Sequence, residues 1–393
     1  MDPSARPITS IDEPGVRAEG QLLYTMRKEV AALLGRQQTS FPGAQPVSFS
    51  RKHLDELLAQ DYYVCEKSDG IRYLLYFTAD EAGNELHYLI DRKNDYWFIH
   101  HRNLHFPIKG DDQRFHTRTL ADGELVMDDG PDGTKVPRFL VFDCLVLDGK
   151  DLMARTLDKR LAYFQENVMN PYRDLFRRYP EELPYQAFQM AMKDMQLGYG
   201  IEKMFREVLP SLKHGNDGLI FTCRNTAYQF GTDPHILKWK PVHENTIDFR
   251  LRLAFPAAEP DDADRADGVV EPYVDYDALP RAELLVYWGD TAGGEPYQPF
   301  AELHLTEDEW EALKALGDPL QNRIVECAMD ESGRWRLYRF RDDKAEANHI
   351  STVRSVMDSI RDSVSEQELL DAAPAIKEAW KLRQAREVQA QKR

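Results

Sequence analysis

Short runs of β-branched and aromatic residues follow one another between residues 62 and 148 without a helical pattern between them. The runs are YYVC at 62–65, YLLYF at 73–77, a strand-turn-strand pattern over 85–100, TRTLADGELVMD at 117–128 and RFLVFDCLVLD at 138–148. Such runs, separated by Asp-Gly and other turn signals, are typical of strands. Strands joined without a helical crossover pair antiparallel. The first half of the chain is therefore predicted to form antiparallel sheet.

Helical spacing of apolar residues indicates a smaller number of helices in this half. They are predicted over residues 21–34, 51–60, 157–179 and 185–209. Ser50 is expected to cap the second of them. Two further strands are predicted in DGLIFTCR and ILKWKP, near residues 217–224 and 236–241. The pattern as a whole predicts an α+β fold.

Composition changes after Pro241, which indicates a second domain. The acidic stretch FPAAEPDDADRADGVVEP reads as a solvated loop. Around it lie five short strand candidates and one helix, over 307–316, which together predict a small barrel of the OB type. Helices are expected over 350–363 and 366–391, the second broken near Pro374. We expect residues 1–245 to form one domain with helix 365–393 packed back on it, and residues 246–364 to form the barrel.

Bulk properties exclude several classes of protein. The 393 residues contain no apolar run near the roughly 20 residues of a membrane span and no visible secretory signal, so a soluble intracellular protein is expected. The four cysteines are widely spaced and predict neither a zinc ribbon nor a disulfide scaffold. With 50 basic and 67 acidic residues the net charge is −17, so any polyanion must be bound by a local basic cluster.

Several chemically suitable residues occur in the strand region. Lys67 begins K-x-D-G-x-R, and Lys238 and Lys240 share a strand face, as two phosphate contacts could. Alone, the first pattern is more typical of a charged hairpin tip, and the second of a solvated strand face. The carboxylates near strand ends, any of which alone is more typical of a turn, could hold Mg²⁺ or Mn²⁺; they are Glu124, Asp143 and Asp217. Near the C-terminus, RFRDDK places Arg339, Arg341 and Lys344 within six positions.

The order of these motifs resembles that of a known superfamily. K-x-D-G-x-R, D-G-E-L, V-F-D-C-L, D-G-L-I-F, L-K-W-K-P and R-x-R-x-D-K follow each other as in the covalent nucleotidyltransferases, which include ATP-dependent ligases and mRNA capping enzymes. The resemblance runs from about Phe41 to Asn348. E-K-S-D-G at the nucleophile and Asp217, where ligases usually carry Glu, are similar to the capping branch. FPGAQPVSFSRKH and DYYVCEKSDGIRYLL are similar to fungal mRNA guanylyltransferases.

This resemblance implies a reaction and roles for residues. Lys67 would attack GTP, carry GMP as a phosphoramidate and pass it to 5′-diphosphate RNA, with Mg²⁺ or Mn²⁺ held by Asp217 and Glu124. Arg72 and Glu124 would contact the ribose, with Arg92 also near the nucleotide. Phe142 would stack on guanine, and Lys193 would read the guanine edge. Lys238 and Lys240 would bind the α-phosphate. Asp248 would contact the nucleotide-bound lysine face, and in a closed form Arg339, Arg341, Asp343 and Lys344 would contact the β- and γ-phosphates. Many relatives have Pro before Asn348 where this chain has Ala347, a difference expected to leave activity intact.

The resemblance also implies partners and a location. These are an RNA 5′-triphosphatase subunit, the phosphorylated tail of RNA polymerase II, and the nucleus. Three alternatives stay open on the residues. They are an ATP-dependent polynucleotide ligase, a non-catalytic scaffold of a capping complex, and a two-metal nuclease built from Asp69, Glu124, Asp143 and Asp217.

Overall fold

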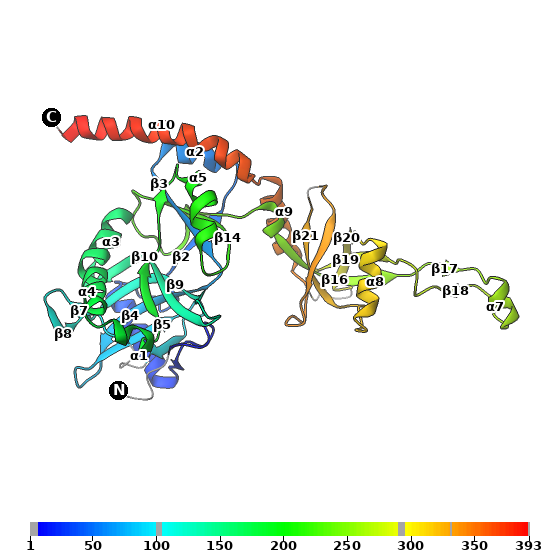
Figure 1. Cartoon of the computed structure of the whole chain (residues 1–393), viewed down its shortest axis with the longest axis horizontal. Helices are drawn as coiled ribbons and strands as arrows, with labels where there is room; N and C mark the ends of the chain where they lie inside the picture. The colour runs from blue at the N-terminus through cyan, green and yellow to red at the C-terminus, as the bar shows by residue number, and fades with distance from the viewer. Residues whose placement is uncertain (1–6, 100–103, 290–294, 331, 392–393) are drawn as a thin grey trace. The chain divides into compact units, whose positions relative to one another are not determined.

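The computed structural model describes residues 7–99, 104–289, 295–330 and 332–391 (Figure 1). The chain divides into two compact units, residues 1–239 with 366–393 and residues 240–365. Within the described ranges, every helix is too short or too polar to cross a membrane.

The larger unit contains a sheet in the strand order β1-β6-β5-β4-β9-β10-β11, with β12 paired to β10. Its strands are β1 (Val16–Arg17), β4 (Ile71–Ala79), β5 (Glu85–Ile90), β6 (Tyr96–Ile99), β9 (Thr119–Asp129), β10 (Lys135–Leu147), β11 (Lys150–Asp151) and β12 (Gln189–Met192). All neighbours pair antiparallel except β10 and β12, which confirms the expected antiparallel sheet. His100, predicted to end the strand now called β6, lies outside the described residues.

Both faces of this sheet are covered by apolar side chains. On β4, Leu75 and Phe77 pack in one core cluster, whereas Leu74 and Tyr76 belong to another on the opposite face. Alternation along a strand sends successive side chains to opposite faces, so both clusters draw on the same strand.

A second sheet of the larger unit has the order β13-β3-β14-β15-β2. Its strands are β2 (Ala44–Ser48), β3 (Tyr62–Ser68), β13 (Gln196–Leu197), β14 (Asn216–Cys223) and β15 (Gly231–Trp239). A small two-stranded sheet is formed by β7 (Pro107–Ile108) and β8 (Asp111–Phe115). The Asp69-Gly70 pair between β3 and β4 is therefore no hairpin tip, because it carries the chain from one sheet to the other.

The helices of the larger unit agree in part with the sequence. Helix α1 (Gly20–Leu33) lies where it was predicted, and α2 (Lys52–Ala59) does also. Ser50 does not cap α2 through its hydroxyl, which lies 3.0 Å from His53 Nδ1. The segment 157–178 is helical throughout, as α3 (Leu157–Phe164), the π-helical turn η2 (Gln165–Met169) and α4 (Asn170–Arg178), and the 3₁₀ turn η3 (Pro180–Tyr185) follows.

The helix predicted over 185–209 is wrong in its first half. Residues 189–192 form β12, which pairs parallel with β10, and β13 follows at Gln196–Leu197. Apolar residues in QAFQMAMKDMQL fit helical spacing, but pairing with a buried strand decides the structure. Only α5 (Ile201–Lys203), the π-helical turn η4 (Met204–Val208) and α6 (Leu209–Ser211) are helical.

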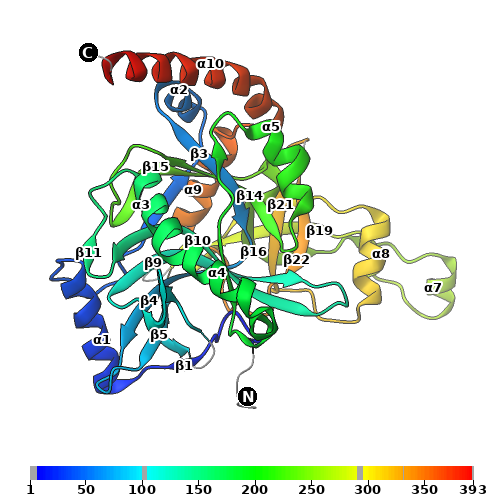
Figure 2. The same ribbon diagram turned by 60° about the vertical axis from the view of Figure 1, so that its left-hand side comes forward.

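Helix α10 (Glu366–Gln391) returns the end of the chain to the larger unit, where it packs on α2 and α5 (Figures 1 and 2). Pro374 lies inside α10 without breaking it, contrary to the prediction; one backbone hydrogen bond is lost while the neighbouring Ala373 and Ile376 stay buried. Arg383 Nε lies 2.7 Å from Asp61 Oδ1 and fastens the helix to the end of α2.

The smaller unit is a closed five-stranded barrel in the order β16-β19-β20-β22-β21. Its strands are β16 (Thr246–Ala254), β19 (Arg281–Tyr287), β20 (Tyr297–Leu303), β21 (Ile324–Met329) and β22 (Trp335–Phe340). Counted along the chain the order is 1-2-3-5-4 with α8 (Glu307–Ala315) between the third and fourth strands, consistent with the expected OB type. The 3₁₀ turn η5 (Val242–Glu244) precedes the barrel, and α9 (Ile350–Arg361) packs on β16 and β19.

The acidic segment after β16 is ordered, although it was predicted to be a solvated loop. β17 (Ala257–Ala258) pairs with β18 (Tyr273–Val274), and α7 (Asp262–Ala266) lies between them with a capping box formed by Asp261 and Asp264. Most of its charged side chains are exposed, as the acidic composition predicts, but composition alone does not indicate the capping box or the pairing of β17 with β18.

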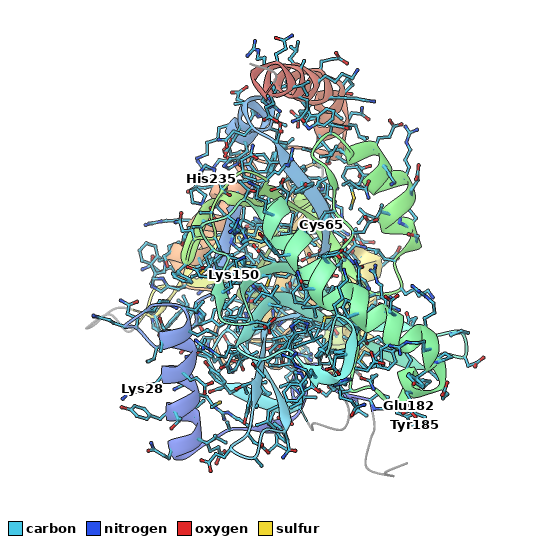
Figure 3. All side chains as sticks on the ribbon, turned by 90° about the vertical axis from the view of Figure 1, so that its left-hand side faces the viewer. Lys28, Cys65, Lys150, Glu182, Tyr185 and His235 are labelled. Carbon is cyan, nitrogen blue, oxygen red and sulfur yellow. The ribbon has the colours of Figure 1, made fainter. Side chains whose placement is uncertain are left out.

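All four cysteines are buried and form no disulfide, as predicted. Cys65, labelled in Figure 3, lies deep among the side chains of the larger unit, while Tyr185 and Glu182 lie at its margin.

Candidate active site

Lys67 lies on β3 opposite an irregularity in β14. Ser68 pairs with Asn216 and Glu66 pairs with Leu219, so Asp217 and Gly218 together stand opposite Lys67. Gly218 has φ +144°, a backbone conformation that favours glycine. Such a bulge redirects a side chain. Here Asp217 Oδ1 accepts a hydrogen bond of 2.6 Å from Lys67 Nζ.

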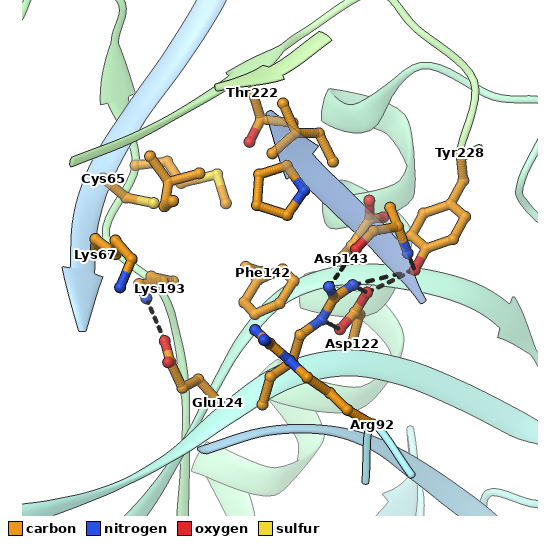
Figure 4. Close-up of a pocket in the computed structure, with 16 residues that line it drawn as sticks. Cys65, Lys67, Arg92, Asp122, Glu124, Phe142, Asp143, Lys193, Thr222 and Tyr228 are labelled. Carbon is orange, nitrogen blue, oxygen red and sulfur yellow. Dashed lines mark hydrogen bonds and ion pairs between the residues drawn. The ribbon is translucent and has the colours of Figure 1, made fainter. Parts of the chain in front are cut away.

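A pocket opens beside Lys67, lined by residues of both sheets of the larger unit (Figure 4). It brings together six of the predicted site residues: Lys67, Arg72, Arg92, Glu124, Phe142 and Lys193. With Asp122 and Asp143, which also line it, the pocket wall has four cations and three carboxylates, a formal charge of +1 on a chain of net charge −17. Asp217 is not part of the pocket wall and reaches it through Lys67.

Phe142 reaches the pocket because of a second bulge. Val141 pairs with Gly123 and Asp143 pairs with Asp122, so Phe142 is the extra residue of β10. Both Phe142 and Asp143 line the pocket, which strict alternation along a strand forbids. The ring lies 5.5 Å from the Arg72 guanidinium and 5.9 Å from Lys193 Nζ.

Arg72 is buried and held by Asp122. Its Nε and Nη2 lie 2.9 and 2.6 Å from the two Asp122 oxygens, and its Nη1 donates to the Ala44 carbonyl. Burial would lower the pKa of Arg72, but the Asp122 carboxylate outweighs it and raises this pKa. The Tyr228 hydroxyl donates to Asp122 Oδ2 at 2.7 Å and accepts from the Ala44 amide at 3.0 Å. The pair therefore fastens β2 to β4 and β9, and the ribose contact of Arg72 stays a prediction.

Lys193 follows β12 and is not on a helix. Its Nζ donates to Ser68 Oγ at 2.5 Å and to Glu124 Oε2 at 3.0 Å. Burial would lower the pKa of Lys193, but Glu124 and Glu66 raise it above its usual value. Glu124 is thus engaged by a cation at the pocket edge, and its ribose contact stays a prediction.

Two further predicted cations, Arg92 and Lys238, are placed on the pocket side. The Arg92 side chain points into the pocket toward Phe142, without an ion pair or hydrogen bond to any other described residue (Figure 4). Burial and the neighbouring Arg72 lower the pKa of Arg92. Ile236 of β15 lines the pocket, and Lys238, two residues along, shares its strand face.

The remaining predicted residues belong to residues 240–365, the smaller unit, in which Lys240 is the first residue. Asp248 of β16 is buried there, with Arg341 Nη1 3.1 Å from its Oδ1 and Lys344 on its Oδ2. Asp343 pairs with Arg341 at 2.8 Å, and Arg339 with Glu326 at 2.6 Å. The barrel thus brings these basic residues together, each with a carboxylate partner of its own unit.

Sequence reasoning missed Asp122, Tyr228 and Arg160. Asp122-Gly123 was read as a turn, yet it lies inside β9, where a Cβ on Gly123 would come within 2.4 Å of the Phe139 ring. Asp122 and Glu124, two residues apart, share a strand face, which was the available signal. Arg160 engages Asp143 with two hydrogen bonds of 2.7 and 2.8 Å in the interior. This pairing removes Asp143 from the carboxylates that a two-metal nuclease would use.

The carboxylates present fit a divalent ion whose remaining ligands come from substrate phosphates and water. No group of three or more His, Cys, Asp and Glu side chains among the described residues is arranged to hold a metal ion. Mg²⁺, however, usually takes one or two carboxylates together with water and substrate phosphates. Asp217 and Glu124 supply carboxylate oxygens of that kind near Lys67.

Comparison with known proteins gives consistent results over nearly the whole chain. The family model described as "mRNA capping enzyme, catalytic domain" matches residues 9–242, and "mRNA capping enzyme, C-terminal domain" matches residues 244–370. The chain is 61% identical to the mRNA-capping enzyme subunit alpha of Neurospora crassa over 96% of this chain and 95% of the relative. It is 46% identical to that of Schizosaccharomyces pombe, over 97% and 91% respectively. A solved mycobacterial DNA ligase D complexed with ATP and MES matches 77% of this chain and 95% of its own, at 15% identity and a TM-score of 0.36.

Proposed function

The chain belongs to the mRNA capping enzyme family and is an mRNA guanylyltransferase, and from this premise we propose that Lys67 is its nucleophile. The observation that carries the proposal is the Lys67 amine at the pocket wall, 2.6 Å from Asp217 Oδ1. Lysine must be neutral to attack phosphorus. Asp217 orients the amine through this hydrogen bond.

Two displacements make up the reaction. In the first, the neutral amine attacks the α-phosphorus of GTP, a P–N bond forms, the P–O bond to the β-phosphate breaks and pyrophosphate leaves, while the amine nitrogen gives up one proton to water. In the second, a terminal oxygen of 5′-diphosphate RNA attacks the same phosphorus, the P–N bond breaks and the GpppN cap is released. The Lys67 amine then recovers its proton, so the protein is unchanged after one cycle.

The pocket walls provide the remaining roles. Phe142 stacks on guanine, and Lys193, held at the pocket edge by Ser68 and Glu124, binds the guanine edge. Arg72 and Glu124 contact the ribose, and Arg92 lies near the nucleotide. We assign the α-phosphate to Lys238 and Lys240, and the nucleotide-bound lysine face to Asp248. In a closed form, the β- and γ-phosphates are assigned to Arg339, Arg341 and Lys344, with Asp343 holding Arg341 at 2.8 Å. Among these nucleotide contacts, the role of Arg92 has the best support, because its side chain lines the pocket and no described carboxylate pairs with it.

Asp217 and Glu124 would hold Mg²⁺ or Mn²⁺. A bound divalent ion neutralises phosphate charge as pyrophosphate leaves.

The proposal extends to partners and location. The relatives are named alpha subunits, which supports a separate RNA 5′-triphosphatase subunit. We include the phosphorylated tail of RNA polymerase II and the nucleus, because cap formation acts on new transcripts. Microscopy of a fluorescent fusion tests the location, and binding of a phosphorylated tail peptide tests the second partner.

Covalent labelling tests the nucleophile directly. Purified protein is mixed with Mg²⁺ and α-labelled GTP, or with α-labelled ATP, and the denatured chain is examined for label. We expect label from GTP, no label with Lys67→Ala, and label that pyrophosphate removes. Lys159→Ala, a lysine on α3 outside the pocket, is the matched control and keeps its label. Label on Lys67→Ala would show that another residue is the nucleophile, and label from ATP alone would indicate a ligase.

A further inference from the structure

A buried cluster of charged side chains surrounds Glu66, the residue that precedes Lys67 on β3. Glu66, on the strand face opposite Lys67, lies 3.8 Å from Lys193 Nζ and 3.9 Å from His214 Nε2, measured from its Oε1. His214 Nδ1 lies 2.7 Å from Asp128 Oδ1. The side chains of Glu66, Lys193 and His214 are only 4, 3 and 9% exposed. This chemistry is not used by the two displacements described above.

The charges of this group balance only if His214 is a cation. Lys193 and Arg138 supply two positive charges, the latter 3.0 Å from Asp128 Oδ2. The carboxylates, which are Glu66, Glu124 and Asp128, supply three negative charges. With a neutral imidazole the buried group keeps one unpaired negative charge, which is costly away from water.

Two buried atoms of this group also indicate that His214 is a cation. Glu66 Oε2 and His214 Nε2 are buried, and neither has a hydrogen-bond partner among the described residues. If Nδ1 donates to Asp128, a neutral ring presents a lone pair toward the Glu66 carboxylate, whereas the imidazolium presents an N–H. Glu66 raises the pKa of His214, burial opposes that rise, and Asp128 adds to it.

His214 also lies in the segment that carries Asp217. The Lys213 carbonyl accepts from the Asp129 amide at 2.8 Å, and the Gly215 carbonyl accepts from the Asp69 amide at 2.8 Å. Asp217 then reaches Lys67. The segment 213–217 is therefore fastened to β9 at one end and to the nucleophile at the other, with the His214 side chain between β9 and β3.

We propose that His214 is a positioning residue: as an imidazolium it balances Glu66 and Asp128 and holds segment 213–217 so that Asp217 stays in hydrogen-bond contact with Lys67. The proposal rests on the proposed role of Lys67. The charged groups that face the ring are Glu66 from β3 and Asp128 from β9, with Lys193 and Arg138 behind them. Because the folded state favours the cation, the support is complete at low pH and is lost as pH rises through the pKa of His214.

Single-turnover labelling with GTP across pH 6 to 9 tests this role. For His214→Gln we expect the rate at saturating GTP to fall about 10- to 100-fold, the effect of misplacing a reacting group, with little change in the GTP concentration for half-maximal rate. The wild-type rate should decline, relative to the His214→Gln rate, as pH rises through the pKa of His214, so the ratio of the two rates should fall toward one at high pH. His214→Lys, which keeps a charge, should retain more of the rate. His116→Gln is the matched control, since His116 is a buried histidine beside a carboxylate, 2.9 Å from Asp148, outside the pocket.

The double variant Glu66→Gln, His214→Gln separates positioning from simple packing. Removing the negative charge removes the need for the cation, so the double variant should be faster than His214→Gln alone. This comparison also decides the case if His214→Gln does not fold, since the double variant should then fold and label. Wild-type rates and pH profile in His214→Gln, or no recovery in the double variant, would overturn the proposal. If the wild-type protein itself takes no label from GTP, the proposed function fails instead.

Discussion

Replacing Asp122 with Asn should strongly destabilise the larger unit, because Arg72 loses a buried counter-charge. Asp122 is fully buried and makes two hydrogen bonds of 2.6 and 2.9 Å to Arg72, while Tyr228 adds a third at 2.7 Å. Asn keeps the shape and loses the charge. Breaking a buried pair from one side typically costs about 3 to 5 kcal/mol. At about 2 to 4 °C per kcal/mol for a unit of this size, the melting temperature should fall by about 6 to 20 °C.

Scanning calorimetry of the whole chain measures this effect, with the labelling reaction run in parallel. Asp112→Asn is the matched control, because Asp112 forms a comparable two-bond pair with Arg178 at the surface, with side chains 35 and 51% exposed. An exposed pair contributes about 1 kcal/mol or less. We also expect Asp122→Asn to weaken GTP labelling, since Arg72 lines the pocket. A destabilisation below 1 kcal/mol with unchanged labelling would refute the view that this pair holds the two sheets together.

Three other substitutions have defined outcomes. Burial opposes ionisation of Glu85, but its hydrogen bond with His105 outweighs it and lowers the pKa of Glu85 to about 2. Its stabilising effect is present above pH 4.5 and is lost as pH falls toward 2, so Glu85→Gln should cost about 3 kcal/mol by urea unfolding at pH 7 and less at pH 4. Phe142→Ala should raise the GTP KM of labelling about 5- to 150-fold, from the 1 to 3 kcal/mol of base stacking; an unchanged KM would contradict that contact. Arg383→Ala removes the nearest cation from buried Asp61 and should lower the unfolding free energy by about 3 kcal/mol, whereas Arg386→Ala, on the same helix, should not.

The sequence predicted those parts of the fold that depend on local pattern. Strands β3, β4, β9 and β10 follow from alternation and β-branched content, and the barrel follows from five short runs with turns. It failed at residues 189–192, where pairing with β10 overrides a helical pattern. The Asp122-Gly123 pair is a turn signal by composition although it lies within β9, and no sequence pattern marks the bulge at Asp217-Gly218 in β14. Turn propensity cannot show that a glycine is needed for close packing or for a bulge.

The site could be predicted only where a motif marked it. Lys67 and Phe142 were named in advance through the resemblance to a family, and the pocket contains both. The partners of Arg72 were not, because Asp122 and Tyr228 are separated by 106 positions and no short pattern joins them. The bulges that aim Asp217 and Phe142 each insert one residue into a strand, and alternation alone gives no sign of this.

The return of α10 to the larger unit has a consequence for synthesis of the protein. Residues 240–365 are made between the two parts of that unit, so the barrel can fold from contiguous chain while the larger unit is still incomplete. Asp61 and Arg383 are 322 positions apart, so the pair forms only after residues 240–365 have been synthesised. A chain cut short before α10 would carry every residue of the reaction and still leave a buried carboxylate without its nearest cation. Such products should be recognised by proteases as unfinished, although their catalytic residues are all present.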